Sequence, residues 1–225
     1  MYEELPAPAG LRCRWRRSST TAEVGRVVPD GCTDIIFSAT GGEVFVAGPD
    51  TSGKVTEMGP TDLHAVRFDP GVGPAVLGVP AHALRDLRVP LAELWGRTDR
   101  LCEELSSAPD PSAVLARVAV ERLRATPPDP LTQAIATAVR TCGVADLADR
   151  LGLSARQLHR RSLAAFGYGP KALQRILRFD EAMSLAWRGV PFADIAHRTG
   201  YADQAHLSRE VRELAGVPLG QLIRP

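Results

Sequence analysis

Val144-Ala-Asp-Leu-Ala-Asp-Arg-Leu-Gly-Leu-Ser154 places a small residue, Ala148, four positions before a glycine, Gly152. A second stretch, Phe192-Ala-Asp-Ile-Ala-His-Arg-Thr-Gly-Tyr-Ala202, repeats this spacing with Ala196 and Gly200. A small residue lets two helices cross closely, and glycine adopts the positive φ that a tight turn between helices often needs. The repeat therefore predicts two helix-turn-helix units, at residues 144–166 and 192–214.

The residues around these units also have helical patterns. Ser154 and Asp203 are suited to cap the amide groups at a helix start, and Pro170 is well placed in the first turn of a long connecting helix. The predicted helices of this part of the chain span residues 131–142, 144–151, 154–166, 170–187, 192–198 and 203–214. These helices together predict a helical DNA-binding domain.

The second helix of each unit should carry the residues that read DNA, because base contacts concentrate near its first turns in the major groove. In the first unit, Leu158 and Leu163 should point inward. Arg156, His159 and Arg160 should share an outward face, where arginine can bind guanine in a bidentate manner.

In the second unit, Leu207 and Val211 should belong to the core. The polar residues of this helix are available to bases or phosphates, and Gln204 is suited to adenine. These polar residues are Gln204, His206, Ser208 and Arg209. Four other basic residues, Arg161, Lys171, Arg198 and Arg212, are expected at phosphates. The alternative for each of these residues is an ordinary solvated side chain.

Residues from about 127 to 225 resemble the DNA-binding domain of AraC/XylS-type transcription regulators. The resemblance rests on Ser154-Ala-Arg-Gln-Leu-His-Arg-Arg, Phe166-Gly-Tyr-Gly-Pro-Lys, Asp194-Ile-Ala-His-Arg-Thr-Gly-Tyr-Ala-Asp-Gln-Ala-His-Leu-Ser-Arg-Glu and Gly216-Val-Pro-Leu. The resemblance implies two helix-turn-helix units joined by a linker helix, with both recognition helices in successive major grooves. The base-reading positions of the family fall on Arg156, His159, Arg160, Gln204, Ala205 and Arg209.

The chain departs from the family pattern at a few positions. Ser162 stands where the family usually has a core aromatic residue, and Val211 and Ala215 occupy positions that are commonly Phe. Ala205 removes one polar reader. We therefore expect unit one to be the dominant reader and unit two to specify fewer base pairs.

The first 80 residues contain short β-rich runs separated by Gly and Pro, which is typical of an antiparallel barrel or sandwich. The strands expected from these runs span residues 25–31, 34–37, 43–47 and 64–69. This part also resembles, more loosely, the cupin-like domain of unknown function that precedes such DNA-binding domains. The phrases that carry this resemblance are Val28-Pro-Asp-Gly-Cys-Thr-Asp-Ile-Ile-Phe, Val46-Ala-Gly-Pro-Asp-Thr, Val66-Arg-Phe-Asp-Pro-Gly and Leu77-Gly-Val-Pro-Ala.

Beyond Pro80 the pattern becomes helical, with segments expected at 82–87, 91–95, 97–105 and 111–123. The last has an apolar stripe, which packs either on its own sensor domain or on a second copy in a homodimer. A Pro-rich joint follows at residues 126–130. The chain thus divides into a cupin-like sensor (1–98), a helical linker and possible dimerisation segment (99–130) and the DNA-binding domain (131–225). The expected fold class is α+β, with a small antiparallel, cupin-like β-barrel at the N-terminus followed by an all-α double helix-turn-helix domain.

The charge distribution agrees with this division. The net charge is +1, but residues 144–225 carry 12 Lys and Arg against 8 Asp and Glu. The remaining part carries 15 against 18. A basic half beside an acidic half is suited to a DNA-binding end attached to a module with another task. The sequence shows no secretory signal and no membrane-spanning run, so we expect a cytoplasmic, nucleoid-associated protein.

Three rival roles concern the N-terminal half. Its histidines, His64 and His82, lie far apart, so a metal-binding cupin enzyme is disfavoured, and no metal, cofactor or catalytic residue is expected. Cys32 is either a redox or alkylation sensor or, the favoured interpretation, a buried structural thiol. The sensor could also bind another protein in place of a small molecule. We predict a regulator, not an enzyme, that binds double-stranded DNA under the control of a small-molecule effector or a partner.

Overall fold

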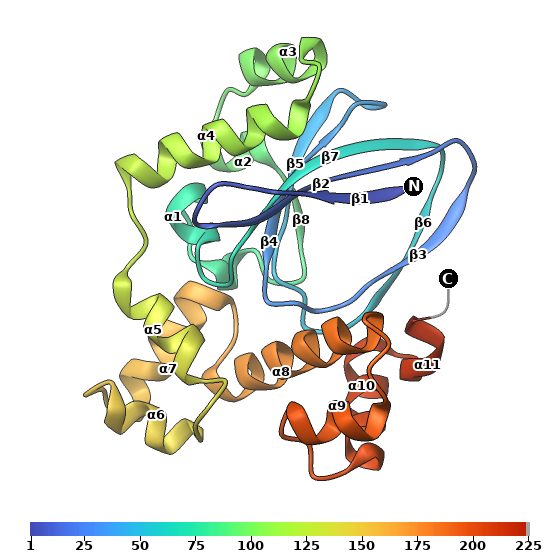
Figure 1. Ribbon diagram of the computed structural model, residues 1–225. Coiled ribbons are helices and arrows are strands. Elements are labelled where there is room, and N and C mark those ends of the chain that lie inside the picture. The colour runs from blue at the N-terminus through green and yellow to red at the C-terminus, as the bar shows by residue number, and fades with distance from the viewer. Residues whose placement is uncertain (224–225) are drawn as a thin grey trace.

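The computed structural model describes residues 1–223 and contains a β-rich N-terminal part followed by a helical C-terminal part (Figure 1). The strands are β1 (Tyr2–Leu5), β2 (Leu11–Ser19), β3 (Glu23–Val27), β4 (Thr33–Ser38), β5 (Glu43–Ala47), β6 (Lys54–Met58), β7 (Thr61–Phe68) and β8 (Arg88–Pro90). Six of them form one antiparallel sheet in the order β1-β2-β7-β4-β5-β8. The other two, β3 and β6, form a separate ribbon that runs toward α8 and α10 (Figure 1).

The helices of the N-terminal part pack on one face of the sheet. They are α1 (Gly73–Leu77), the 3₁₀ turn η1 (Ala81–Ala83), α2 (Leu91–Trp95), α3 (Asp99–Ser107) and α4 (Pro111–Ala125). Leu115 and Ala119 of α4 are buried in the same cluster as Phe37 and Phe68 of the sheet. The apolar stripe of α4 therefore packs on the sheet of its own N-terminal domain, which is one of the two arrangements that the sequence leaves open.

The opposite face of the sheet carries a smaller cluster and a buried ion pair. Cys13, Trp15 and Ile36 form this cluster with Ala65. On the same face, the Nε atom of Arg67 donates to Asp34 at 2.9 Å, and the indole of Trp15 donates to the same carboxylate at 3.2 Å. Burying an unpaired charge is costly, and the carboxylate of Asp34 avoids this cost because it accepts hydrogen bonds from both Arg67 and Trp15.

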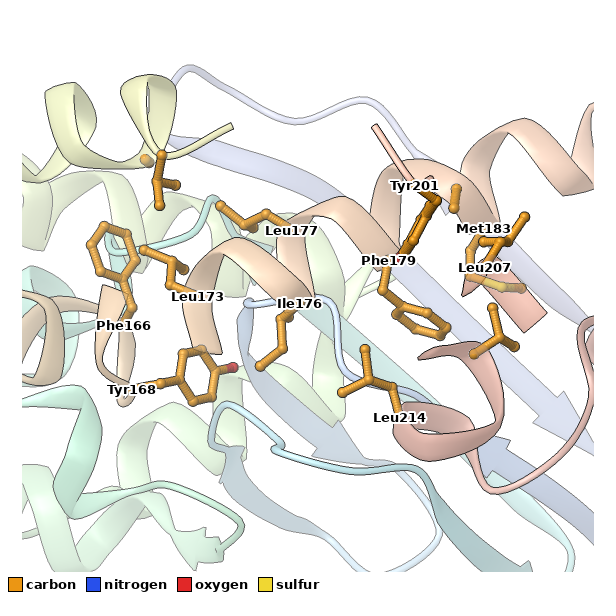
Figure 2. Packing of buried hydrophobic residues seen from close by; sticks show 14 of the residues in the cluster. Phe166, Tyr168, Leu173, Ile176, Leu177, Phe179, Met183, Tyr201, Leu207 and Leu214 are labelled. Atoms are coloured by element: carbon orange, nitrogen blue, oxygen red, sulfur yellow. The ribbon is translucent and has the colours of Figure 1, made fainter. Parts of the chain in front are cut away.

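The C-terminal part is built on one long helix, α8. Its helices are α5 (Pro130–Ala138), α6 (Val144–Arg150), α7 (Ala155–Phe166), α8 (Pro170–Trp187), α9 (Phe192–Arg198), α10 (Gln204–Ala215) and α11 (Leu219–Leu222). Figure 2 shows Phe166, Leu173 and Leu177 at one end of the apolar cluster and Met183 and Leu207 at the other. A single core thus holds α6–α7 and α9–α10 on the two ends of α8.

The helical part lies against the N-terminal part along α7, α8 and α10 (Figure 1). Arg12 of β2 forms an ion pair with Asp180 of α8 at 3.0 Å. Burial raises the pKa of Asp180 above its usual value, and the charge of Arg12 acts in the opposite direction. The hydroxyl of Tyr168, between α7 and α8, donates to the backbone oxygen of Asp50 at 3.2 Å. Polar contacts therefore join the two parts at several points.

The predicted fold class, α+β with an antiparallel N-terminal domain and an all-α double helix-turn-helix domain, is confirmed. Several element predictions need correction. The sequence patterns did not predict β2, the longest strand, or the shorter elements β1, β6, β8, α1 and α11. Residues 82–87 form no α-helix, because only the first two of them belong to the short 3₁₀ turn η1, and the helix expected at 131–142 ends at Ala138. No helix within residues 1–223 is both long and apolar enough to cross a membrane.

Candidate nucleic-acid interface

The two helix-turn-helix units share the same turn geometry. Gly152 and Gly200 have φ angles of 62° and 74°. The backbone amide of Leu153 donates to Ala148 at 2.9 Å, and the amide of Tyr201 makes the same bond to Ala196 at the same distance. Positive φ is accessible to glycine at little cost, so the predicted role of both glycines is confirmed.

Both recognition helices, α7 and α10, start at a side-chain cap. Ser154 accepts from the amide of Gln157 at 3.2 Å, and the Gln157 side chain accepts from the amide of Ser154 at 2.8 Å. This reciprocal pair is a capping box. In the second unit, the carboxylate of Asp203 accepts from the amide of His206 at 2.6 Å. Both predicted N-caps are confirmed, and they fix the helix ends that should face DNA.

The start of α7 is suited to an anion, because its N-cap Ser154 is neutral, whereas the carboxylate of Asp203 lies at the start of α10. Neither α7 nor α10 has an acidic residue in its first turn, whereas the bracing helices α6 and α9 have Asp146 and Asp194 there. The N-terminus of a helix carries a partial positive charge and unpaired amide groups that attract phosphate. Of these four helices, α7 therefore has the N-terminus best suited to a phosphate.

The predicted readers of unit one lie on the surface. Arg156, His159 and Arg160 are exposed, while Leu158 is fully buried. The imidazole of His159 lies against the start of α8, because a Cβ atom at Gly169 would be 2.8 Å from its Cε1 atom. The imidazole of His159 thus lies beside the backbone of Gly169, whereas neither Arg156 nor Arg160 forms an ion pair within residues 1–223. The buried Ser162 donates to the backbone oxygen of Tyr168 at 2.7 Å, so a hydrogen bond replaces the aromatic residue usual in the family.

Arg161 forms an ion pair with the Pro-rich joint. Its guanidinium lies 2.7 Å from the carboxylate of Asp129, and both side chains are about half exposed (44% and 51%). Asp129 also accepts from the amide of Leu131 and so caps α5. A phosphate that approached Arg161 would compete with this carboxylate for the same guanidinium.

Asp129→Asn is expected to tighten DNA binding by about 2- to 5-fold at low salt, which corresponds to the 0.3–1 kcal/mol of an exposed ion pair. Asparagine keeps the cap of α5, because it is as good an N-cap as aspartate. The measurement is a DNA titration of both proteins. In a protein that also carries Arg161→Met, Asp129→Asn should no longer tighten DNA binding. If it tightened binding as much as before, the Arg161–Asp129 ion pair would not be the cause.

The predicted readers of unit two are only partly available. Gln204 and Arg209 are exposed on α10. His206 instead accepts from the amide of Ala202 at 3.3 Å through Nδ1, and the hydroxyl of Ser208 donates to the backbone of Gln204 at 2.9 Å. These two side chains bond within their own unit, whereas Gln204 and Arg209 are the predicted readers of α10 that are exposed and have no such bond among the described residues. The exposed Lys171 lies at the start of α8.

Two arginines of α8 contact the second unit, and the sequence predicted no role for either of them. Arg175 pairs with Glu210 of α10 at 3.0 Å and with Glu213 at 2.7 Å. The guanidinium of Arg178 lies 4.4 Å from the ring centre of Tyr201 in a cation–π contact. Burial raises the pKa of Tyr201 to about 12, although Arg178 acts against this rise. The sequence signal was weak because these partners lie far apart in the chain.

The alternative sites of the N-terminal part are less suited to chemistry. Cys32 is buried, as predicted, and burial raises the pKa of its thiol well above the usual value, which disfavours the reactive thiolate. His64 lies beside Asp62 on the same strand, β7, while His82 belongs to η1. Within residues 1–223 no three His, Cys, Asp or Glu side chains are grouped as a metal site.

Comparison with known proteins places two domain models on the chain. A "Helix-turn-helix domain" matches residues 147–224, and a "Domain of unknown function (DUF6597)" matches residues 9–90. The protein has an AraC-type DNA-binding domain. It is a DNA-binding regulator, in which this AraC-type domain follows a β-rich domain whose role has no established description.

Solved structures show a similar fold over nearly the whole chain. The 1.65 Å structure of ToxT from Vibrio cholerae matches with a TM-score of 0.53 and 12% identity, over 99% of this chain and 97% of ToxT. A structure of ToxT from Vibrio cholerae O395 matches with a TM-score of 0.51 and 12% identity, over 99% and 96%. No curated protein matches the sequence significantly.

Proposed function

We propose that the protein is a sequence-specific transcription regulator whose DNA binding changes when a ligand or partner binds the N-terminal domain. The single observation that supports DNA binding is that α7 and α10 begin in the same way. Each begins at a side-chain cap and lacks an acidic residue in its first turn. Each also presents exposed polar side chains beside that end.

In this proposal α7 and α10 enter two major grooves about one turn, roughly 34 Å, apart on one face of the duplex. Arg156 and Arg160 read guanine, Gln204 reads adenine, and Arg209 binds a base or a phosphate. Lys171 and Arg161 bind phosphates. Unit one is the dominant reader, because two of the predicted polar groups of unit two, His206 and Ser208, are engaged internally.

The domain division is part of the same proposal, with a sensor at 1–98, a linker at 99–130 and the DNA-binding domain at 131–225. The first two parts have two open depressions on their surface where an effector could be sought. One, of about 620 Å³, is lined largely by hydroxyl groups from the turns around Ser19, Thr40 and Thr61. The other, of about 670 Å³, lies between α2, α3 and α4 around Trp95.

We also place the protein in the cytoplasm, associated with the nucleoid, and assign it a binding role without catalysis. A homodimer through α4 would have to use the face of Arg117 and Val118, because the sensor sheet covers Leu115 and Ala119. Analytical ultracentrifugation of the full chain with and without DNA tests this assembly.

Arg160→Ala is expected to weaken binding to the selected DNA site by about 1–3 kcal/mol and to relax the base preference at one position. The reason is the loss of a bidentate contact to a base edge. Selection of binding sites from random-sequence DNA, followed by titration of single-base variants, measures both effects. Unchanged affinity and an unchanged preference would contradict base reading by unit one.

Lys171→Ala is expected to weaken binding to all DNA sequences by a similar factor and to lower the salt dependence by about one ion, because a phosphate contact carries no sequence information. Titrations of a selected site and an unrelated duplex at several salt concentrations provide the measurement. A loss confined to the selected site would assign Lys171 to base reading instead.

A thermal-shift screen of the full chain against metabolites tests the effector. A ligand that binds only the folded state raises the midpoint of unfolding as its concentration rises. A hit should also change affinity for the selected DNA site. If no metabolite in a broad library stabilises the chain and a specific protein is retained in pull-downs, the small-molecule form of the proposal fails.

A further inference from the structure

The N-terminal domain contacts both recognition helices at their C-terminal ends. At the end of α7, Arg85 donates to the backbone oxygen of Gly167 at 3.3 Å, and His82 Nδ1 lies 3.3 Å from the backbone oxygen of Leu163. At the end of α10, Arg26 donates to the backbone oxygen of Ala215 at 2.9 Å. The amide of Gly53 donates to the backbone oxygen of Leu214.

These contacts fit the chemistry of a helix end. The last four carbonyl groups of a helix have no partner within it, and the end carries a partial negative charge. Arg26 and Arg85 each supply both a donor and a positive charge. At Gly53 the approach is close enough that a Cβ atom would lie 2.7 Å from the backbone oxygen of Ala215.

The two contact points are tied to each other within the N-terminal domain. The buried carboxylate of Asp50 pairs with Arg88 at 2.6 Å and with Lys54 at 2.7 Å. The amide of Thr51 donates to Asp86 at 2.8 Å, and Lys54 donates to the backbone oxygen of Asp86 at 2.7 Å. Segment 50–54, next to the α10 contact, is thereby fixed to segment 86–88, next to the α7 contact.

We define these linked segments, residues 50–54 and 82–88 together with Arg26, as the crossbar. We infer that the crossbar fixes the separation of α7 and α10 and so selects the spacing between the two DNA subsites, with Arg26 and Arg85 as specificity-determining residues that touch no base. This inference rests on the proposed function. One added base pair would move the second subsite by about 3.4 Å and rotate it by roughly 34°.

The rival explanation is that α8 alone sets the spacing, because both units also pack on that helix. The two explanations differ in what happens when the crossbar contacts are removed and α8 is left intact. Neither Arg26 nor Arg85 contributes to the apolar core around α8. Their substitution therefore separates the two cases.

The test uses the full chain and a DNA duplex that it selects from a random-sequence pool. Derivatives of this duplex carry one base pair inserted or removed between the two subsites. We expect wild type to lose at least about 10-fold in affinity on each derivative, a loss of the size of one mismatched base pair. The Arg26→Met/Arg85→Met double variant should bind the selected duplex within about 3-fold of wild type and lose less than about 3-fold on the derivatives.

Arg97→Met is the matched control, because Arg97 is 95% exposed and pairs only with Asp99 on its own surface. This variant should keep the spacing preference of wild type. Far-UV circular dichroism and thermal unfolding check the fold of each variant. If the double variant does not fold, Arg26→Met alone takes its place, with an intermediate loss of the spacing preference expected.

The outcomes separate the inference from the function on which it rests. If wild type binds the selected duplex no better than random DNA, the proposed function fails. If wild type discriminates between spacings and the double variant keeps the same discrimination, Arg26 and Arg85 do not determine the spacing and the inference is overturned. It is also overturned if wild type binds all spacings equally while still preferring the selected bases.

Discussion

Phe179→Ala is expected to lower the free energy of unfolding by about 3–5 kcal/mol, the usual cost of removing a buried aromatic side chain. Phe179 lies on α8, is completely buried, and belongs to the cluster that also contains Leu207 and Leu214 of α10 (Figure 2). Removal of the Phe179 ring leaves a cavity between α8 and the helices that pack on it. These helices cannot easily move together to fill the cavity. Urea unfolding of the full chain, followed by far-UV circular dichroism, measures the change.

Trp187→Ala provides the matched control, because Trp187 is an aromatic residue of the same helix that is 61% exposed. Its substitution should change the free energy of unfolding by less than about 1 kcal/mol, since little apolar surface leaves contact with the protein. Equal losses for the two variants would show that the core does not depend on Phe179 in the way described.

Gly71→Ala is expected to lower the free energy of unfolding by about 2–4 kcal/mol and to loosen the contact between the two domains. Gly71 has a φ of 87°, and a Cβ atom there would lie 2.6 Å from Cε1 of Phe166 and close to the side chain of Thr132. The expected loss combines a strain of about 1 kcal/mol from the positive φ with an overpacking cost of about 1–3 kcal/mol. Limited proteolysis within the joint at 126–130 and urea unfolding together measure both effects.

Gly78→Ala separates the two causes. Gly78 has a similar φ of 79°, but no atom lies within 4 Å of the position of its Cβ. This variant should show the backbone strain alone, about 1 kcal/mol, with no increase in cleavage of the joint. If it matched Gly71→Ala in both measurements, packing against Phe166 would contribute nothing to the contact between the domains.

The helices of the DNA-binding domain could be predicted from the sequence because their signals are local. Caps such as Ser154, the proline at the start of α8 and the apolar spacing all lie within the element that they define. The boundaries of α8, α9, α2 and β5 agree with the prediction. By contrast, β2 was missed although it alternates apolar residues with arginines from Leu11 onward, which is the period of a half-buried strand. It lies between β1 and β7 in the sheet.

The sequence predicts which residues of the candidate site face outward, but it does not predict the contacts that these residues make with the rest of the protein. The exposure of Arg156 and Arg160 follows from helical spacing relative to Leu158. The engagement of His206 depends on the geometry of one turn, and that of Arg161 on a partner 32 residues away. The contact of Arg26 with Ala215 spans 189 residues, a separation over which sequence periodicity carries no information.

The contacts at the ends of α7 and α10 have a consequence for retargeting the protein. All four are made to main-chain oxygens, and none uses a side chain of either recognition helix. Positions 156, 160, 204 and 209 can therefore be exchanged without changing any group that the N-terminal domain holds. An engineer, or natural selection, could assign this protein a new operator while its response to its own signal is retained.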